Sequence, residues 1–302
     1  MTVNERIIIK WHPKIISLLL FSLMSIMGFE SRAQSGALNI NDVALTHSAN
    51  SFVVLDATLY KNKPNLSLSG IKPANVFYVA RFWDDWSKAP KDKLPDEKLV
   101  RKLAREARAK NSLLIVDIEH WPLSGDDKTI ADSISKYSTV MQWIRNEEPE
   151  LKTGYFGILP VANYSIYRKT VDSSDYKQWQ IQNDRLKPLA RVVDVIFPYT
   201  YTYYPDQEAW VQFAIKNIKE ARRYGKPVYV FLWPQYTEQN KKLSGQYVAP
   251  DYWKLQLETV RQYADGVVIW GGWGDNGPVS WDENAPWWQV TKEFLDKLKR
   301  ED

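Results

Sequence analysis

Short apolar segments rich in β-branched residues recur along the chain, and amphipathic segments separate them. The apolar segments occupy residues 52–59, 76–83, 112–119, 153–159, 192–199, 228–234 and 266–273. Helical periodicity covers residues 96–110, 127–146, 206–224, 252–264 and 287–299. Strands that are apolar on both faces and are followed by helices are typical of a parallel sheet. The pattern therefore predicts an α/β fold.

The arrangement of these units favours a barrel over an open sheet. An open doubly wound sheet usually carries a glycine-rich phosphate loop after its first strand, and residues 56–60 contain no glycine. The units follow one another without a repeat or a linker, which indicates a single domain over residues 34–302. We predict a single (β/α) TIM-like barrel, made irregular by having seven strands. Residues 160–191 are expected to form an excursion above the barrel mouth.

Residues 1–33 are typical of a secretory signal peptide. Basic residues precede an apolar stretch over residues 15–29, and Ser31 and Ala33 supply small residues before a cleavage site. This stretch is shorter than the roughly 20 residues that a membrane span needs. We expect an exported protein, periplasmic or secreted, with no stable membrane insertion after cleavage. The alternative is an uncleaved N-terminal anchor.

The composition argues against several classes of function. The absence of cysteine excludes disulfides, thiol nucleophiles and thiolate metal sites. A net charge of +4, with no run of Lys or Arg longer than two, gives no sign of a nucleic-acid partner. A metal-dependent hydrolase would have only His47 and His120 after signal cleavage, so we expect no metal and no cofactor. The 14 Trp and 17 Tyr exceed what packing requires.

Two carboxylates end the third predicted strand. Asp117 and Glu119 are two residues apart, so on a strand both side chains point to the same face. Chemistry in a barrel takes place at the carboxyl ends of the strands, and adjacent carboxylates favour a state in which one keeps its proton. Glycoside hydrolysis needs an acid for the leaving oxygen and a carboxylate for the developing positive charge. The structural alternative is that one of the two caps a helix or pairs with an interior Arg or Lys.

Aromatic residues crowd the ends of the other predicted strands. These are Trp83 in the second strand, Tyr199 and Tyr201 in the fifth, Trp233 in the sixth and Trp270 in the seventh. Sugar rings present apolar C–H faces edged by hydroxyls, which suits aromatic platforms combined with hydrogen-bonding groups. The pattern predicts a carbohydrate partner, with ordinary core packing as the alternative.

Three segments, in order along most of residues 50–275, resemble the hyaluronidase family of glycoside hydrolases. Residues 116–122 are similar to its Asp-x-Glu strand end, residues 153–160 with Asn163 and Tyr164 to its fourth-strand segment, and residues 265–272 to its last strand. The resemblance implies an irregular seven-stranded barrel. The chain differs from the family in lacking cysteine. It also has His-Trp-Pro after the Glu, where the family usually shows a second acid and then Trp-Arg-Pro.

The resemblance implies a retaining, substrate-assisted glycosidase that acts at 2-acetamido sugars. Glu119 would be the acid and base, and Asp117 would orient the acetamido group, whose oxygen attacks the anomeric carbon. Tyr164, with Tyr199 or Tyr201, would hydrogen-bond that group. Trp270 would pack against its methyl.

The sequence leaves two other interpretations open. A retaining glycosidase on neutral sugars would need a second carboxylate as nucleophile, and Asp84 and Asp85 are the acids placed to serve. A non-catalytic carbohydrate-binding barrel would carry the same aromatic platforms, although it has no need of adjacent acids on one strand.

Overall fold

The computed structural model describes residues 52–88, 92–274 and 276–301. These residues belong to one compact unit, which begins at Ser51. The predicted signal peptide and His47 lie outside the described residues.

Parallel strands form two sheets, in agreement with the predicted α/β class. One sheet has the order β2 (Lys72–Pro73), β1 (Val53–Thr58), β7 (Gly266–Gly271) and β6 (Tyr229–Leu232). The other has the order β3 (Val76–Tyr78), β4 (Leu113–Asp117) and β5 (Lys152–Tyr155). Every pairing within the two sheets is parallel.

The fifth predicted strand connects these sheets through isolated bridges. Phe197 bridges Phe156 after β5, and Tyr199 bridges Phe231 of β6. Pro198 has no N–H to donate to a ladder, which explains why no continuous strand forms, while its carbonyl accepts from Phe231 N at 2.8 Å. The strands thus follow one another from β3 through β6 and β7 to β1. On the other side of β1 lies β2, which precedes β3 by two residues in the chain, and Ala74 N between them donates to Asp56 O of β1 at 2.8 Å.

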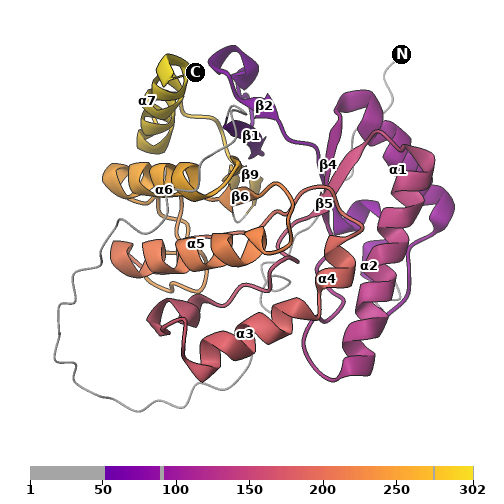
Figure 1. Cartoon of the computed structure of the whole chain (residues 1–302). Coiled ribbons are helices and arrows are strands. Elements are labelled where there is room, and N and C mark those ends of the chain that lie inside the picture. The colour runs from indigo at the N-terminus through magenta and orange to yellow at the C-terminus, as the bar shows by residue number, and fades with distance from the viewer. Residues whose placement is uncertain (1–51, 89–91, 275, 302) are drawn as a thin grey trace, which may run out of the picture. The chain divides into compact units, whose positions relative to one another are not determined.

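The five predicted helices are present, at nearly the expected bounds. They are α1 (Glu97–Lys110), α2 (Asp127–Glu147), α5 (Gln207–Arg222), α6 (Pro250–Tyr263) and α7 (Pro286–Glu301). Asp96, Asp126 and Asp206 cap three of them by accepting a backbone N–H. Figure 1 shows α5, α6 and α7 side by side, and α1 beside α2. None of the described helices is both long and apolar enough to cross a membrane.

Two expectations about local structure need correction. Residues 160–191 are not simply an excursion above the strands, because they form α3 (Ser174–Asp184) and α4 (Lys187–Ala190) after the 3-10 helix η4 (Tyr164–Arg168). Helix α3 lies against α5, where Gln180 donates to Glu220 at 3.0 Å. The second predicted strand ends at Tyr78 and continues as the 3-10 helix η2 (Val79–Arg81).

The smaller elements lie in the connections. They are the 3-10 helices η1 (Leu66–Ser69) and η3 (Trp86–Lys88) and the strands β8 (Trp273–Gly274) and β9 (Gly277–Pro278).

An apolar layer fills the space between the strands and positions the side chains at the carboxyl ends of the strands. Its buried members are Leu55, Ala57, Ile115, Val195, Phe197, Phe231 and Val268. Residues two apart on a strand share a face. The side chains that follow Val76, Ile115, Phe197 and Val268 are therefore Tyr78, Asp117, Tyr199 and Trp270. The apolar layer thus places an acid and three aromatic residues together at the carboxyl ends of the strands.

We expect Gly154→Ala to lower the free energy of unfolding by at least about 2 kcal/mol, because the interior has no room for a methyl group. A Cβ at Gly154 would lie 2.2 Å from Val195 O and 2.6 Å from the Phe197 ring. Urea denaturation measures the change. Lys152→Ala, at an exposed position of the same strand, is the control and should change stability by less than about 0.5 kcal/mol. Equal effects of the two substitutions would contradict this packing.

Candidate active site

Asp117 and Glu119 lie at and just beyond the end of β4, and both are partly exposed. Burial raises the pKa of Asp117 to about 7. Burial also raises the pKa of Glu119 well above its usual range, and the charge of Asp117 raises it further. The pair therefore retains a proton to higher pH than isolated carboxyl groups do.

No basic side chain neutralises this pair in the described part of the chain. No Lys or Arg there forms an ion pair with Asp117 or Glu119. Neither carboxylate accepts a helix-capping bond, since the capping carboxylates belong to other aspartates. The structural alternative, in which one of the acids caps a helix or pairs with a cation, finds no support. An unneutralised pair with raised pKa values is instead typical of acid–base sites.

Tyr78 and Trp270 form the side of the site next to Asp117. Tyr78 lies beside Asp117 in the β3–β4 register. The indole Nε1–H of Trp270, on β7, donates to the Tyr78 hydroxyl at 3.1 Å. Burial raises the pKa of Tyr78, and the charge of Asp117 contributes to this shift. Tyr78 is therefore a neutral hydroxyl within reach of the charge of Asp117.

Tyr201 belongs to the aromatic wall of the site, which consists of the rings of Tyr201, Trp233 and Trp270. Its ring stacks on Trp270 with centroids 6.1 Å apart. Burial raises the pKa of Tyr201 well above its usual range, with smaller contributions from Tyr78, Asp117 and Glu119. The Trp233 ring meets Trp270 edge-on at 5.0 Å and Tyr201 at 5.8 Å. The structure thus brings Tyr201, Trp233 and Trp270 together next to the carboxylates.

Gly157 allows Glu119 and Tyr199 to approach each other closely. Its φ of +68° is in the left-handed region that favours glycine. A Cβ at this position would lie 3.0 Å from Glu119 Oε1 and 3.1 Å from the Tyr199 ring. Burial raises the pKa of Tyr199 well above its usual range, and Tyr203 and Glu119 raise it further. Tyr199 is therefore a neutral hydroxyl beside the acid.

Tyr164 and Asn163 lie at the start of η4, in a row of residues that also includes Tyr203 and Phe213. The Tyr164 ring packs against Tyr203 and Phe213, with centroids 4.9 and 5.1 Å apart. Burial raises the pKa of Tyr203 to about 12, and the charge of Glu119 contributes. Asn163 precedes η4, and its side chain accepts from the Ser165 hydroxyl at 2.7 Å.

Trp83 belongs to a separate aromatic cluster. It is 8% exposed and packs against Trp86, His120 and Trp121, with centroids 5.0, 5.3 and 6.3 Å apart. No ring contact joins Trp83 to Tyr201, Trp233 or Trp270 in the part of the chain that the structure describes. Its ring contact with His120, the residue after Glu119, connects it to the site.

Sequence reasoning missed Tyr78, Gly157 and Tyr203. Tyr78 could have been found by period two, because it follows the inward-facing Val76 by two residues. A glycine at the end of the fourth predicted strand was a weaker signal for a close approach. Tyr203 stands in a run of tyrosines that offers no means of choosing among them.

The site offers two carboxyl groups and several neutral hydroxyls. Among the described residues, no three His, Asp or Glu side chains gather closely enough to hold a metal ion. A pair of carboxyl groups of this kind can transfer a proton and stabilise a developing positive charge.

Glu119→Gln should stabilise the protein, and increasingly so as the pH rises above about 4.3, the ordinary pKa of Glu. The folded wild type keeps the Glu119 proton that the unfolded chain releases, so its free energy of unfolding falls with rising pH until the folded pKa is passed. We expect a gain of about 1–3 kcal/mol at pH 8 and almost none at pH 4, measured by urea denaturation.

The matched control is Glu106→Gln, for which we expect the opposite sign. Hydrogen bonds from Arg81 and Lys110 lower the pKa of Glu106 to about 2. Its ionised form therefore stabilises the fold at neutral pH, and the variant should lose stability there. A loss of stability at pH 8 in Glu119→Gln would contradict the raised pKa of Glu119.

Comparison with known proteins shows the fold. The structure aligns with bee venom hyaluronidase in complex with a hyaluronic acid tetramer at a TM-score of 0.55, with 13% identity, over 82% of this chain and 96% of that chain. A second structure of bee venom hyaluronidase gives a TM-score of 0.50 and 12% identity, over 82% and 97%. No protein-family model and no curated protein matches the sequence. The likeness confirms the expected fold class and the resemblance of this fold to that of a hyaluronidase.

Proposed function

We propose that the protein is a glycoside hydrolase that cleaves a polysaccharide or oligosaccharide at 2-acetamido sugars, with retention of configuration. The observation that carries this proposal is the pair Asp117 and Glu119. Both pKa values are raised, no Lys or Arg among the described residues pairs with either acid, and Tyr201, which stacks on Trp270, lies near them. Such a pair supplies the acid and the charge-stabilising carboxylate that glycosidic cleavage requires.

In the proposed reaction, Glu119 transfers its proton to the glycosidic oxygen as the bond to the anomeric carbon breaks. The 2-acetamido oxygen of the substrate forms a new bond to that carbon. Asp117 accepts a hydrogen bond from the acetamido N–H and stabilises the positive charge of the cyclic intermediate. Glu119, now ionised, takes a proton from water as the water oxygen bonds to the anomeric carbon. The bond between that carbon and the acetamido oxygen breaks, which restores the acetamido group. Two displacements at one carbon give retention.

The aromatic residues would position the sugar. Tyr199 and Tyr201 are neutral hydroxyls near the acids and can donate hydrogen bonds to the acetamido group. Trp270 offers a ring face for its methyl group, and Trp233 extends the wall. Tyr164 is assigned to the same sugar, through the row that includes Tyr203.

Asn163 and Trp83 take more distant places in the proposal. Asn163 adjoins Tyr164 at the start of η4, and Trp83 lies in the cluster around His120. We assign both residues to sugar units beyond the one that reacts.

The positions of the other acids support substrate assistance. A protein nucleophile should lie about 5–5.5 Å from the acid. Asp84 and Asp85 are on the exposed turn between η2 and η3, where Asp85 accepts from Ser87 N at 3.0 Å. Asp56 and Asp265, in or next to strands, form ion pairs with basic side chains. These placements favour the acetamido group of the substrate as the nucleophile.

Export is part of the proposal. It is based on the signal-like sequence of residues 1–33 alone. N-terminal sequencing of the protein recovered outside the cytoplasm tests it, with Gln34 as the expected first residue.

A reducing-end assay on polysaccharides with and without 2-acetamido groups tests the reaction. We expect turnover of the acetamido sugars only, reduced roughly a thousandfold in Glu119→Gln. Turnover confined to neutral sugars would overturn substrate assistance. Binding of a sugar without turnover of any would overturn the enzyme in favour of a non-catalytic binder.

The pH profile of Asp117→Asn tests the assignment of roles. In the wild type, activity should fall below about pH 7 as Asp117 gains a proton, and fall at higher pH as Glu119 loses its own. Removing the charge of Asp117 lowers the pKa of Glu119. The variant, normalised to its own maximum, should therefore lose the acid limb and show an alkaline limb moved to lower pH. An unmoved alkaline limb would show that the two groups are not coupled.

A further inference from the structure

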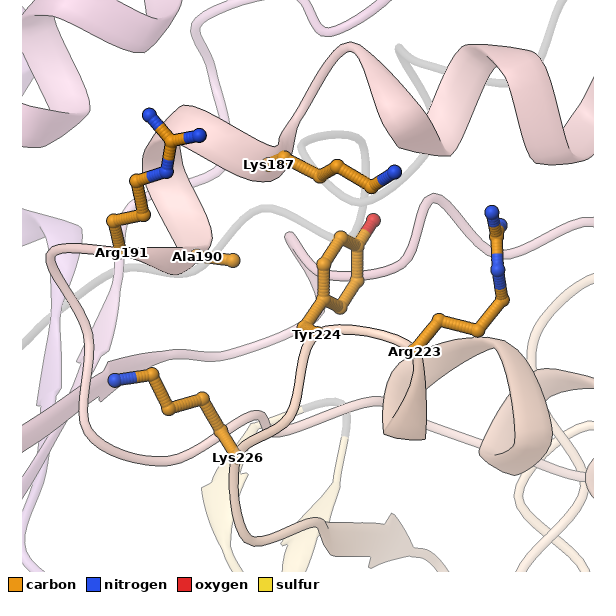
Figure 2. A pocket seen from close by; sticks show the side chains of 6 residues that line it. All are labelled: Lys187, Ala190, Arg191, Arg223, Tyr224 and Lys226. Atoms are coloured by element: carbon orange, nitrogen blue, oxygen red, sulfur yellow. The ribbon is translucent and has the colours of Figure 1, made fainter.

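A basic pocket lies at the amino ends of two neighbouring strands, away from the carboxylate pair. It has a volume of about 320 Å³ and is lined by Lys187, Ala190, Arg191, Arg223, Tyr224 and Lys226. Figure 2 shows Tyr224 among the four cationic side chains. Asp117, Glu119 and their aromatic wall lie at the carboxyl ends of the strands, so this pocket has no role in the proposed hydrolysis.

The backbone holds the two sides of the pocket together. One side is α4 with the residue after it, and the other is the turn that follows α5. Gly225 makes this turn with a φ of +68°, and its N–H donates to Arg222 O at 3.0 Å. The bridge between Ile196 and Val228, just beyond the two segments, keeps them adjacent.

Two of the four cations are partly neutralised. Asp184 accepts from Lys187 at 2.9 Å and from Arg223 at 2.8 Å. Arg223 also pairs with the buried carboxylate of Glu220. These contacts orient the two cations and leave further N–H donors on each of them.

The other two cations have no such partner. Within the described residues, no carboxylate pairs with Arg191 or Lys226. The cations of the pocket thus outnumber the carboxylates bonded to them by two. The Tyr224 hydroxyl donates to Asn183 O at 3.0 Å, which fixes the ring that forms the pocket wall.

We propose that this pocket binds a doubly charged tetrahedral oxyanion of the phosphate class, either free or as an ester on a sugar. The charge of such a group matches the excess of positive charge. Its oxygens can accept from guanidinium and ammonium groups that line the pocket, and charge-assisted bonds of this kind are the strong ones. The pocket is also large enough for a sugar unit against Tyr224. This inference is independent of the proposed glycosidase activity.

Isothermal titration of inorganic phosphate and of glucose 6-phosphate into the protein, at low ionic strength, tests the proposal. We expect saturable binding of one ligand per chain that weakens as salt is added. Arg191→Gln combined with Lys226→Gln should reduce the affinity at least about tenfold, since each substitution removes a charged donor. Tighter binding of the sugar phosphate would identify an ester as the ligand, and equal binding would identify the free anion.

The matched control combines Lys102→Gln with Arg108→Gln on α1. It changes the net charge equally at exposed positions outside the pocket. We expect the control to bind phosphate as the wild type does, and both double variants to keep the thermal unfolding midpoint of the wild type without ligand. Equal weakening in the two double variants, or no saturable binding by the wild type, would overturn the proposal.

Discussion

The parallel direction of the strands is the constraint on which the rest of the structure depends. Parallel strands bring their carboxyl ends to one edge, and period two then decides which side chains meet there. The apolar layer that includes Ile115 and Val268 is buried. The next inward positions on the same strands hold Asp117 and Trp270. The buried core therefore positions Asp117 and Trp270 relative to each other.

The site is built at a cost to stability. Two adjacent acids lie among tyrosine and tryptophan side chains, and no Lys or Arg of the described residues forms an ion pair with them. Burial disfavours the ionised form of both acids. Charge is distributed unevenly along the strands, because Arg191 and Lys226 gather at the amino ends while the acids lie at the carboxyl ends. A basic residue near Glu119 would stabilise its ionised form and remove the proton that the proposed reaction needs.

The sequence predicted the elements better than it predicted the site. Periodicity located the strands and the five helices, because each one buries a continuous apolar face. Periodicity was wrong about the fifth strand, because Pro198 has no N–H for a ladder and the segment forms isolated bridges instead. Asp117 and Glu119 were visible as a spaced pair of acids in an apolar strand. The grouping of Tyr201 with Trp270 depends on contacts across the interior, which a linear pattern does not contain. Gly157 owes its role to a backbone conformation that the sequence does not specify.

The proposed chemistry requires that Glu119 keep its proton at neutral pH, because of burial and the charge of Asp117. Infrared difference spectroscopy of wild type minus Glu119→Gln measures this directly, through the carbonyl band of a protonated carboxylic acid. We predict that this band is present at pH 7 and disappears only at higher pH, and that in an Asp117→Asn background it disappears at a lower pH. A Glu119 carboxyl that is already ionised at pH 6 would contradict the role of Glu119 as the acid.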